Sequence, residues 1–328
     1  MQALVQLRLD RLPSAVLETL RAASVFGQLF WTGGIAALLD RDVTADLKVA
    51  DEEEIIIAQP SSRVAGQNEW LFRQAIVRDV AHGTILDDDK RALHLAAAEW
   101  LEGTGNVDLG HIAHHFELGG DLDRAAELYA RATQQALGNF GQMEAALELA
   151  QRGLECGAAG GERAQLLLTQ AHVFNRMGRL ADGVSAAEQA GTLVPAGSDM
   201  WVEAQRLHGA CLIESGRSAE GDARLSWALG PDIASELGDD AVATLQAARV
   251  RGLIDLSKSD AALESSEIAV QAAHAAGRRG EIAMLRALDA RLFALMIACL
   301  PSQAVEVGEA LIEAADRAGD IHLSLIHI

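Results

Sequence analysis

A short glycine-led segment recurs in the middle of this chain. Its two clearest copies are Gly178–Gly183 and Gly216–Gly221, and a helix-like run stands before and after each copy. Around the first Gly of each copy, small residues occur seven positions before, five positions after and twelve positions after. A fixed spacing of small residues around a turn predicts a helical hairpin that is repeated along the chain. The fold is therefore expected to be an array of such hairpins.

The spacing is typical of tetratricopeptide-type hairpins. Further turn markers follow the same template at Gly120, Gly141, Ser257 and Cys299, which predicts five or six hairpins of about 40 residues each. The helix predicted between the first two of these turns closes one hairpin and opens the next.

We single out the small residues as the positions where the helices are predicted to pack, because each small side chain lets one helix approach its neighbour. A large side chain at Ala171 or Ala190 is expected to overpack that contact at a cost of roughly 1–3 kcal/mol. The predicted packing and turn positions are Ala113, Gly120, Ala125, Ala132, Gly141, Ala171, Gly178, Gly183, Ala190, Gly209, Gly216, Gly221, Ala228, Ala262, Ala269 and Ala304.

The composition supports closely packed helices and argues against polyanionic partners. Half of the 328 residues are apolar but only 4% are aromatic, which suits helices that meet through small side chains. The formal net charge is −20, so we expect neither nucleic acid nor an anionic membrane surface as a partner. Three isolated cysteines and no visible signal peptide or membrane-spanning apolar run predict a cytoplasmic protein.

The two ends of the sequence have unusual features. Leu323–Ile328 resembles the translation of a transposase sequencing adapter, so we expect the native sequence to stop near His322, within a helix. Met1 leads into the chain without a cap or lead-in and is interpreted equally well as an internal methionine.

The first part of the chain has a different pattern from the array. Amphipathic or capped segments predict helices over 15–26, 32–39 and 44–50, the last with Thr44 as its N-cap. Ile55–Ile57 and Glu69–Phe72 are then predicted as two paired strands. Three helices followed by a two-stranded ribbon is the layout of a winged helix.

These patterns together predict a mainly α protein. A winged-helix-like domain is expected over 1–86, and a connecting helix and linker over 87–107. A right-handed α-α superhelix of tetratricopeptide-like repeats is expected over 108–322, and 323–328 is the adapter-like segment.

The sequence contains no recognisable catalytic motif. A phosphate loop of the form G-x-x-x-x-G-K-[ST] is absent, as are a G-x-S-x-G elbow and a zinc-type Cys/His pairing. Gly157–Gly161 is glycine-rich, but it lacks the lysine and is predicted to be a linker between two helices. We therefore predict no catalytic, cofactor-binding or metal-binding residues.

The strongest alternative is a metal site at His111 and His115, four residues apart on one helix face, with His114 and Glu117 nearby. No third ligand stands at a motif spacing, so the histidines are instead expected to flank a core-facing side of the helix.

Other residues with possible functions have structural interpretations that we favour. Asp51–Glu54 is expected to be a solvated loop, and Asp87–Asp89 suits the start of a helix. Trp201 and Trp227 could line a peptide groove, but tryptophans in helical repeats usually belong to the core. The predicted third helix carries Asp46 with Lys48, whereas a DNA-reading helix would be rich in arginine and lysine.

Several stretches resemble bacterial signal-transducing ATPases of the STAND/AAA class. Residues 7–34, from Leu-Arg-Leu-Asp-Arg-Leu-Pro to Phe-Trp, resemble the segment that follows the ATPase core in that family. Leu71–Asp79 and Leu93–Leu101 resemble the stretch after the wing. His114–Phe116, with the glycines and the Arg-Ala-Ala that follow it, resembles the start of the family's helical repeats.

The resemblance implies a switch. In that family an ATPase module lies upstream, sometimes with a kinase or nucleotide-cyclase domain, and the winged helix packs on it while the superhelix senses an effector or partner protein. ATP or ADP and Mg²⁺ are then expected only in that upstream module, in cis, and a protein or peptide is expected on the concave face of the repeats.

The chain departs from the family pattern at two places. It has Phe72-Arg73-Gln74 where Phe-x-His is common, and Ala81-His82 where Ala-Tyr is common. In related ATPases a winged-helix histidine can contact the nucleotide, and Gln74 puts that contact in doubt here.

Three functional hypotheses follow. The first is a non-catalytic regulatory fragment of a multidomain signalling ATPase. The second is a free-standing repeat adaptor that scaffolds other proteins. The third is the sensor region of a transcription activator whose DNA-binding domain lies beyond His322.

Overall fold

The computed structural model describes residues 2–105, 108–137 and 142–318 and is mainly helical. The chain divides into two compact units. Unit 1 comprises residues 1–135 and 151–158, and unit 2 comprises residues 136–150 and 159–328. The predicted adapter-like segment at 323–328 and the predicted turn at 138–141 lie outside the described residues. The domain bounds predicted from the sequence are a different division and stay a prediction.

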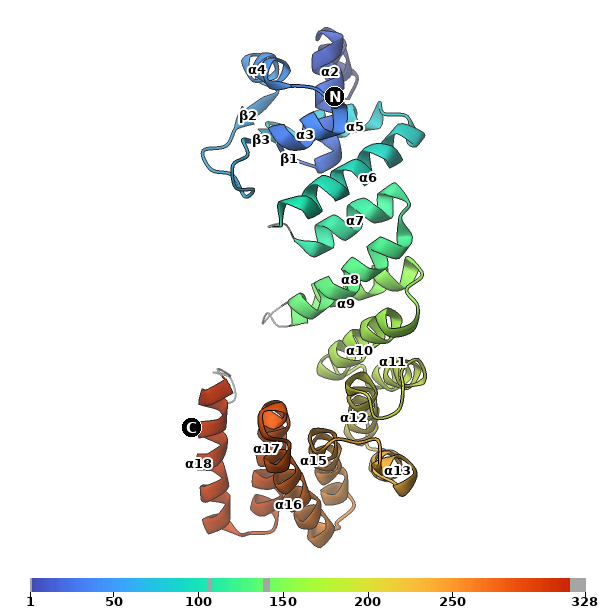
Figure 1. The fold of residues 1–328 in the computed structure, drawn as a ribbon, viewed down its shortest axis with the longest axis vertical. Helices are drawn as coiled ribbons and strands as arrows, with labels where there is room; N and C mark the ends of the chain where they lie inside the picture. Colours follow the sequence, from blue (N-terminus) through green and yellow to red (C-terminus); the bar gives the residue numbers. More distant parts are fainter. Residues whose placement is uncertain (1, 106–107, 138–141, 319–328) are drawn as a thin grey trace. The chain divides into compact units, whose positions relative to one another are not determined.

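Unit 1 combines short helices with a small antiparallel sheet (Figure 1). Helices α8 and α9 are divided between the two units. The bounds are α1 (Gln2–Leu9), α2 (Ser14–Phe26), β1 (Leu29–Trp31), α3 (Thr32–Leu39), α4 (Thr44–Glu52), β2 (Ile56–Ala58), β3 (Glu69–Phe72), α5 (Ala75–Gly83), α6 (Asp87–Thr104), α7 (Leu109–Gly119), α8 (Leu122–Leu137) and α9 (Met143–Glu155).

The sheet has the strand order β1-β3-β2. β3 is central: Phe30 pairs with Trp70 on one side, and Ile56 pairs with Phe72 on the other. The Phe30 and Phe72 rings lie 5.0 Å apart and both side chains are fully buried. These rings therefore join β1 to β3 through one buried apolar contact, which stabilises the pairing of the two strands.

The order of α2, α3, α4, β2 and β3 matches the predicted three helices and ribbon, although the winged-helix assignment itself stays a prediction. Two elements were not predicted. α1 covers residues that alternate only weakly in hydropathy, and β1 is three residues long and pairs with a strand about forty positions away. The predicted N-cap of α4 was also wrong: the helix begins at Thr44, its N-cap is Val43, and the Thr44 hydroxyl donates to the Asp42 carboxylate at 2.7 Å.

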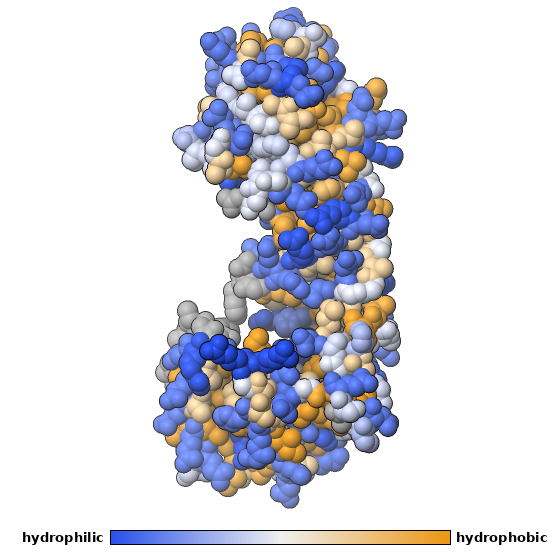
Figure 2. Space-filling model, in the orientation of Figure 1, coloured by the Kyte–Doolittle hydropathy of each residue, from blue (hydrophilic) through white to orange (hydrophobic). Residues whose placement is uncertain are grey.

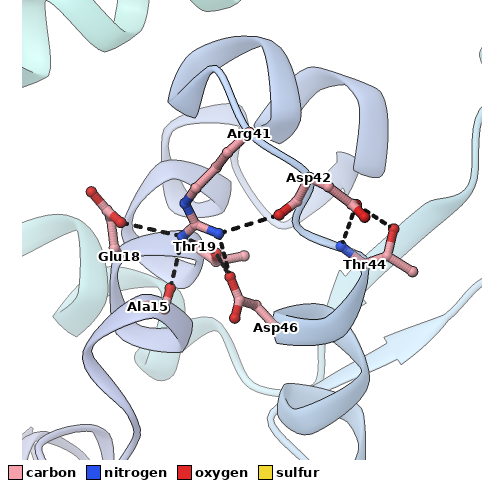
Figure 3. A network of polar contacts seen from close by, with 7 residues as sticks. All are labelled: Ala15, Glu18, Thr19, Arg41, Asp42, Thr44 and Asp46. Carbon is pink, nitrogen blue, oxygen red and sulfur yellow. Dashed lines mark hydrogen bonds and ion pairs between the residues drawn. The ribbon is translucent and has the colours of Figure 1, made fainter.

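Arg41 joins α2 to α4 in unit 1 (Figure 3). Its guanidinium donates to the Asp46 carboxylate at 2.6 Å and to Glu18 at 3.2 Å. It also donates to the Thr19 hydroxyl and to the Ala15 carbonyl, both at 3.1 Å. Thr19 is fully buried and donates in turn to Asp46 at 2.8 Å. The acidic residue of the predicted third helix is therefore used to hold the fold together.

Replacing Arg41 with alanine is expected to lower the free energy of unfolding of unit 1 by about 1–2 kcal/mol, because the mostly buried Asp46 loses a charged partner. Urea unfolding at pH 7 measures this loss. Lys48→Ala is the matched control, since Lys48 is exposed and its ion pair with Glu52 of the same helix is long at 4.0 Å. The Lys48→Ala substitution should change the free energy of unfolding by no more than about 0.5 kcal/mol. Equal losses for the two variants would contradict the assignment.

Unit 2 is a series of helical hairpins. Its helices are α10 (Gly160–Arg176), α11 (Leu180–Thr192), α12 (Asp199–Glu214), α13 (Ser218–Ala228), α14 (Pro231–Ala234), α15 (Asp239–Asp255), α16 (Ser259–Ala276), the 3₁₀ turn η1 (Gly277–Gly280), α17 (Glu281–Ile297) and α18 (Pro301–Ala318). Two details differ from the sequence prediction: Gly160 and Gly161 begin α10 instead of belonging to a linker, and α14 is an additional short helix.

The predicted turn markers at Gly120, Gly178, Gly216, Ser257 and Cys299 are confirmed. Each has a positive φ between 57° and 87° and follows the first helix of a hairpin. The backbone hydrogen bonds are the same in every turn. The N–H of the marker residue donates to the carbonyl of the residue three positions before it, and the N–H of the following residue donates to the carbonyl five positions before that residue. This is the Schellman pattern, which ends a helix with a left-handed residue.

Ser257 occupies this left-handed position without the freedom of glycine, with φ at 58°. A side chain there costs backbone energy that glycine avoids, so Ser257→Gly is expected to raise the free energy of unfolding of unit 2 by about 0.5–1 kcal/mol. Chemical denaturation measures the change. The reverse substitution at the equivalent turn, Gly216→Ser, should lower stability by a similar amount, and a destabilising Ser257→Gly would contradict this account.

The predicted packing positions lie where helices meet. All the predicted alanines are buried. Five of them are fully buried (Ala113, Ala125, Ala171, Ala190 and Ala228), and the other four are at most 8% exposed (Ala132, Ala262, Ala269 and Ala304). The glycines within helices are tightly enclosed: a methyl group added at Gly183 would lie 2.8 Å from the Cys211 sulfur, and one at Gly209 would lie 2.6 Å from Leu225. Gly141 lies outside the described residues. That these positions are required for packing stays a prediction, tested below at Gly221.

Among the described residues, the apolar stretches within individual helices are too short or too interrupted by charge to cross a bilayer.

Candidate functional site

The first helices of successive hairpins pack against one another in unit 2. α10 contacts α12, α12 contacts α15, and α15 contacts α17, so these four helices form a row, here called the first-helix row. The second helices α11, α13, α16 and α18 each pack on their own hairpin partner. A surface made by the first-helix row therefore draws its side chains from several repeats.

A pocket of about 330 Å³ opens on the first-helix row between α12, α15 and α17. Three arginines line it against one carboxylate, and small side chains form its apolar part. The lining residues are Arg206, Ala210, Thr244, Ala247, Ala248, Val250, Arg251, Arg286, Asp289, Ala290 and Phe293. None of the positions predicted from the sequence lies among them.

The Glu203 carboxylate holds two of these arginines. Arg206 donates to both oxygens of Glu203, at 2.6 and 2.9 Å, from one turn further along α12. Arg286 of α17 donates to one of the same oxygens at 3.2 Å. Burial alone would raise the pKa of Glu203, but the hydrogen bonds and charge of Arg206 and the charge of Arg286 outweigh it and lower this pKa to about 2. The carboxylate therefore stays ionised and is shared by two cations.

Arg286 shares Glu203 with a second cation in this arrangement. Burial is the main cause that lowers the pKa of Arg286 and the positive charge of Arg206 lowers it further, whereas the charge and the hydrogen bond of Glu203 raise it. The neighbouring His172 of α10 experiences the same field, since burial and then the charge of Arg206 lower its pKa. Both pKa values are therefore lowered chiefly by burial and next by the positive charge of Arg206, and Glu203 acts against that charge in each case.

Arg251 completes the polar lining from α15. Its guanidinium carbon lies 5.1 Å from the centre of the Phe293 ring, in a cation–π contact. Its Nε lies 3.6 Å from the Asp255 carboxylate, and the side chain is 64% exposed. Arg251 and Phe293 together give the pocket one flat, positively charged wall.

A second polar cluster lies in unit 1, where three helices bring histidines together. His94 of α6 and His115 of α7 are buried, and their Nδ1 atoms lie 3.0 Å apart, so one ring donates and the other accepts. The rings of His111 and His115 meet edge to face with their centres 4.8 Å apart, and the ring centres of His82 of α5 and His94 are 5.8 Å apart. The two histidines proposed from the sequence therefore do meet, within a larger cluster.

This arrangement does not have the form of a metal site. His115 uses its Nδ1 for His94, whereas the Nδ1 of His114 accepts a hydrogen bond from Arg152 at 2.7 Å. Arg152 also forms an ion pair with the Glu117 carboxylate at 3.1 Å. The Tyr129 hydroxyl also donates to Glu117, at 2.6 Å. In the part of the chain that the structure describes, His, Cys, Asp and Glu side chains form no group of three suited to a metal ion.

Sequence reasoning missed His94 and all three arginines of the pocket. His94 could have been found, because it stands three and seven positions before Ala97 and Leu101, on the buried face of α6. Arg251 and Arg286 carry no such signal, since they come from later repeats and share no motif spacing with Arg206.

The other residues proposed from the sequence lie apart from the pocket. Trp201 is buried as expected, but Trp227 is 52% exposed, so its assignment to the core was wrong. It is covered on one side by Arg224, whose guanidinium lies 4.5 Å from the ring centre. Asp87–Asp89 begins α6, as predicted, and the acidic run after Asp51 is mostly exposed at the end of α4.

The comparisons with known proteins concern the fold. No protein-family model matches the sequence, and no curated protein matches it significantly. The structure is similar to the crystal structure of a Signal Transduction ATPase with Numerous Domains (STAND) protein with a tetratricopeptide repeat sensor from Pyrococcus horikoshii, with a TM-score of 0.58 at 13% sequence identity. The likeness covers 100% of this chain and 48% of that chain, so this chain spans about half of that protein's length. The predicted mainly helical, repeat-containing fold is confirmed.

Proposed function

We propose that this chain is the regulatory sensor region of a multidomain signalling ATPase. The hairpins of unit 2 bind an effector, and binding controls a nucleotide-binding module elsewhere in the same protein. The observation that carries this proposal is the pocket on the first-helix row, because it is built by three repeats and cannot be attributed to the packing of one hairpin. Extended surfaces formed by successive repeats are what such arrays use for binding.

The similarity to a STAND protein with a tetratricopeptide repeat sensor supports the proposal at the level of the fold. The resemblance of residues 7–34 and of the stretches that follow supports it at the level of sequence. The first unit then serves as the winged-helix-like link to the ATPase module, in the cytoplasm. ATP and Mg²⁺ belong to that module, and the chain described here takes no part in hydrolysis.

The gene that encodes this chain tests the proposal. A Walker-type nucleotide-binding module in the same reading frame, upstream of unit 1, is the expected result. A complete gene without such a module would instead identify a free-standing adaptor. A basic helix-turn-helix downstream, again without a nucleotide-binding module, would identify a transcription activator.

The purified chain provides a biochemical test. It is expected to show no ATP hydrolysis and no binding to duplex DNA at low salt, where its acidic character opposes a phosphate backbone most strongly. Measurable turnover, or micromolar affinity for DNA, would contradict the proposal.

A further inference from the structure

The chemistry of the pocket on the first-helix row is unexpected in so acidic a chain. The formal net charge of the protein is −20, yet three arginines and one aspartate line a single pocket. The arginines come from α12, α15 and α17, so they converge through the packing of three repeats and not through a basic stretch of sequence.

The arginines differ in how far they are already satisfied. Arg206 is bound by both oxygens of Glu203 within α12, which fixes its guanidinium. Arg286 donates one hydrogen bond, at 3.2 Å, to a Glu203 oxygen that also accepts from Arg206. Each guanidinium has five N–H donors, so the Glu203 contact leaves Arg286 with donors to spare.

The flat wall of the pocket adds a second cation. Arg251 lies over Phe293 and is 64% exposed, so its remaining N–H groups face solvent or the pocket. The weak contact with Asp255, at 3.6 Å, does not occupy the whole guanidinium. Arg251 and Arg286 are therefore the two groups that a ligand's negative charge would meet.

The rest of the lining sets the size and polarity of the ligand. The alanines at positions 210, 247, 248 and 290 provide short apolar contacts, and Thr244 adds a hydroxyl. A volume of about 330 Å³ lies at the lower end of the range for small-molecule pockets. On the face drawn in Figure 2, hydrophilic and hydrophobic residues alternate over the described part of unit 2 instead of forming one broad apolar band.

We propose that this pocket binds a small organic oxyanion, with its carboxylate or phosphate group held by Arg286 and Arg251. Planar guanidinium groups pair with carboxylates and phosphates through two parallel hydrogen bonds, which gives both affinity and orientation. Arg206 and Glu203 act as positioning residues that hold Arg286 at the pocket. The inference rests on the proposed function, because it gives the sensor's effector a chemical class.

Titration calorimetry of the intact chain with three probes tests this assignment. Malonate and inorganic phosphate represent the two oxyanions, and malonamide is the neutral counterpart of malonate. Malonate or phosphate should bind at least tenfold more tightly than malonamide. Equal binding of malonate, phosphate and malonamide, or binding of none of them, would overturn the proposal.

Substitutions locate the binding. Arg286→Ala is expected to weaken oxyanion binding about tenfold or more, since it removes a charged hydrogen-bonding group. Arg217→Ala is the matched control, because Arg217 also pairs with a glutamate, Glu220, but is half exposed and lies outside the pocket. Equal losses in the two variants would overturn the assignment.

Circular dichroism and the thermal midpoint establish that each variant is folded. If Arg286→Ala does not fold, Arg251→Ala provides the same test, because its exposed side chain can be removed with little effect on packing. An Arg251→Ala protein that binds malonate and phosphate with unchanged affinity would overturn the proposal. The gene test of the proposed function is independent of these measurements, so either idea can fail alone.

Discussion

Lowering the pH from 7 to 5 is expected to reduce the free energy of unfolding of unit 1 by about 2–4 kcal/mol, through His94 and His115. Burial, and then the charges of His82, His114, His111 and Lys90, lower the pKa of His94 to about 4. Burial, and then His111, His94 and His114, lower the pKa of His115 to about 2.

The direction of the effect follows from the two states of the protein. The unfolded histidines take up protons as the pH falls below about 6.5, whereas the folded ones stay neutral until about pH 4 or below. The stabilising contribution of the neutral pair is complete above pH 6.5 and is lost as the pH falls towards the folded pKa values. Each histidine contributes up to about 1.4 kcal/mol per pH unit within that window.

Urea unfolding curves at pH 7 and pH 5 measure this loss. The double variant His94→Gln with His115→Gln keeps hydrogen-bonding groups but cannot titrate, so the same pH change should reduce its stability by a smaller amount. His82, His111 and His114 in the same unit, whose pKa values burial also lowers, are unchanged in the variant and provide the background. An equal pH dependence in the two proteins would contradict the role of the histidine pair.

Gly221→Ala is expected to lower the free energy of unfolding of unit 2 by about 1–3 kcal/mol, although alanine is the better helix former. A methyl group at Gly221 of α13 would lie 2.5 Å from the Ile213 side chain and 2.9 Å from the Gly209 carbonyl oxygen of α12. The backbone oxygen cannot rotate away, so the two helices must separate and lose contacts.

Gly308→Ala is the matched control for that substitution. Gly308 is also within a helix of unit 2, but a methyl group there would meet no atom within 4 Å. It should raise stability by about 0.5–1 kcal/mol, the normal gain for replacing glycine within a helix. Chemical denaturation of both variants measures whether the free energy of unfolding falls for Gly221→Ala and rises for Gly308→Ala. If both substitutions were stabilising, the small residues would not be required for packing.

The repeat was predictable because its signals are local. A Schellman turn ends a helix within a few residues, and its hydrogen bonds are the same at Gly178 and at Ser257, so the period could be followed even where glycine is replaced. A small residue at a helix crossing is likewise a feature of one position. These signals depend on neighbouring residues in the chain, which a single sequence contains.

The pocket could not be predicted because it depends on the packing of separate repeats. Arg206 and Arg286 are eighty positions apart and meet at the Glu203 carboxylate only because α12 and α17 both border the pocket with α15. The pairing of β1 with β3 was missed for a similar reason, since strand partners distant in sequence leave no spacing to recognise. The exposure of Trp227 also depends on how α13 is turned in the array.

The central claim is that the hairpin array controls a nucleotide-binding module in the same protein. The most direct measurement is the rate of ATP hydrolysis by the full-length gene product, compared with a version that lacks residues 159–318 of unit 2 and with the Arg286→Ala protein. The account predicts a severalfold change in rate when the array is removed, and a response to a pocket-binding oxyanion that Arg286→Ala abolishes. Identical rates with and without the array, and no response to any pocket ligand, would contradict it.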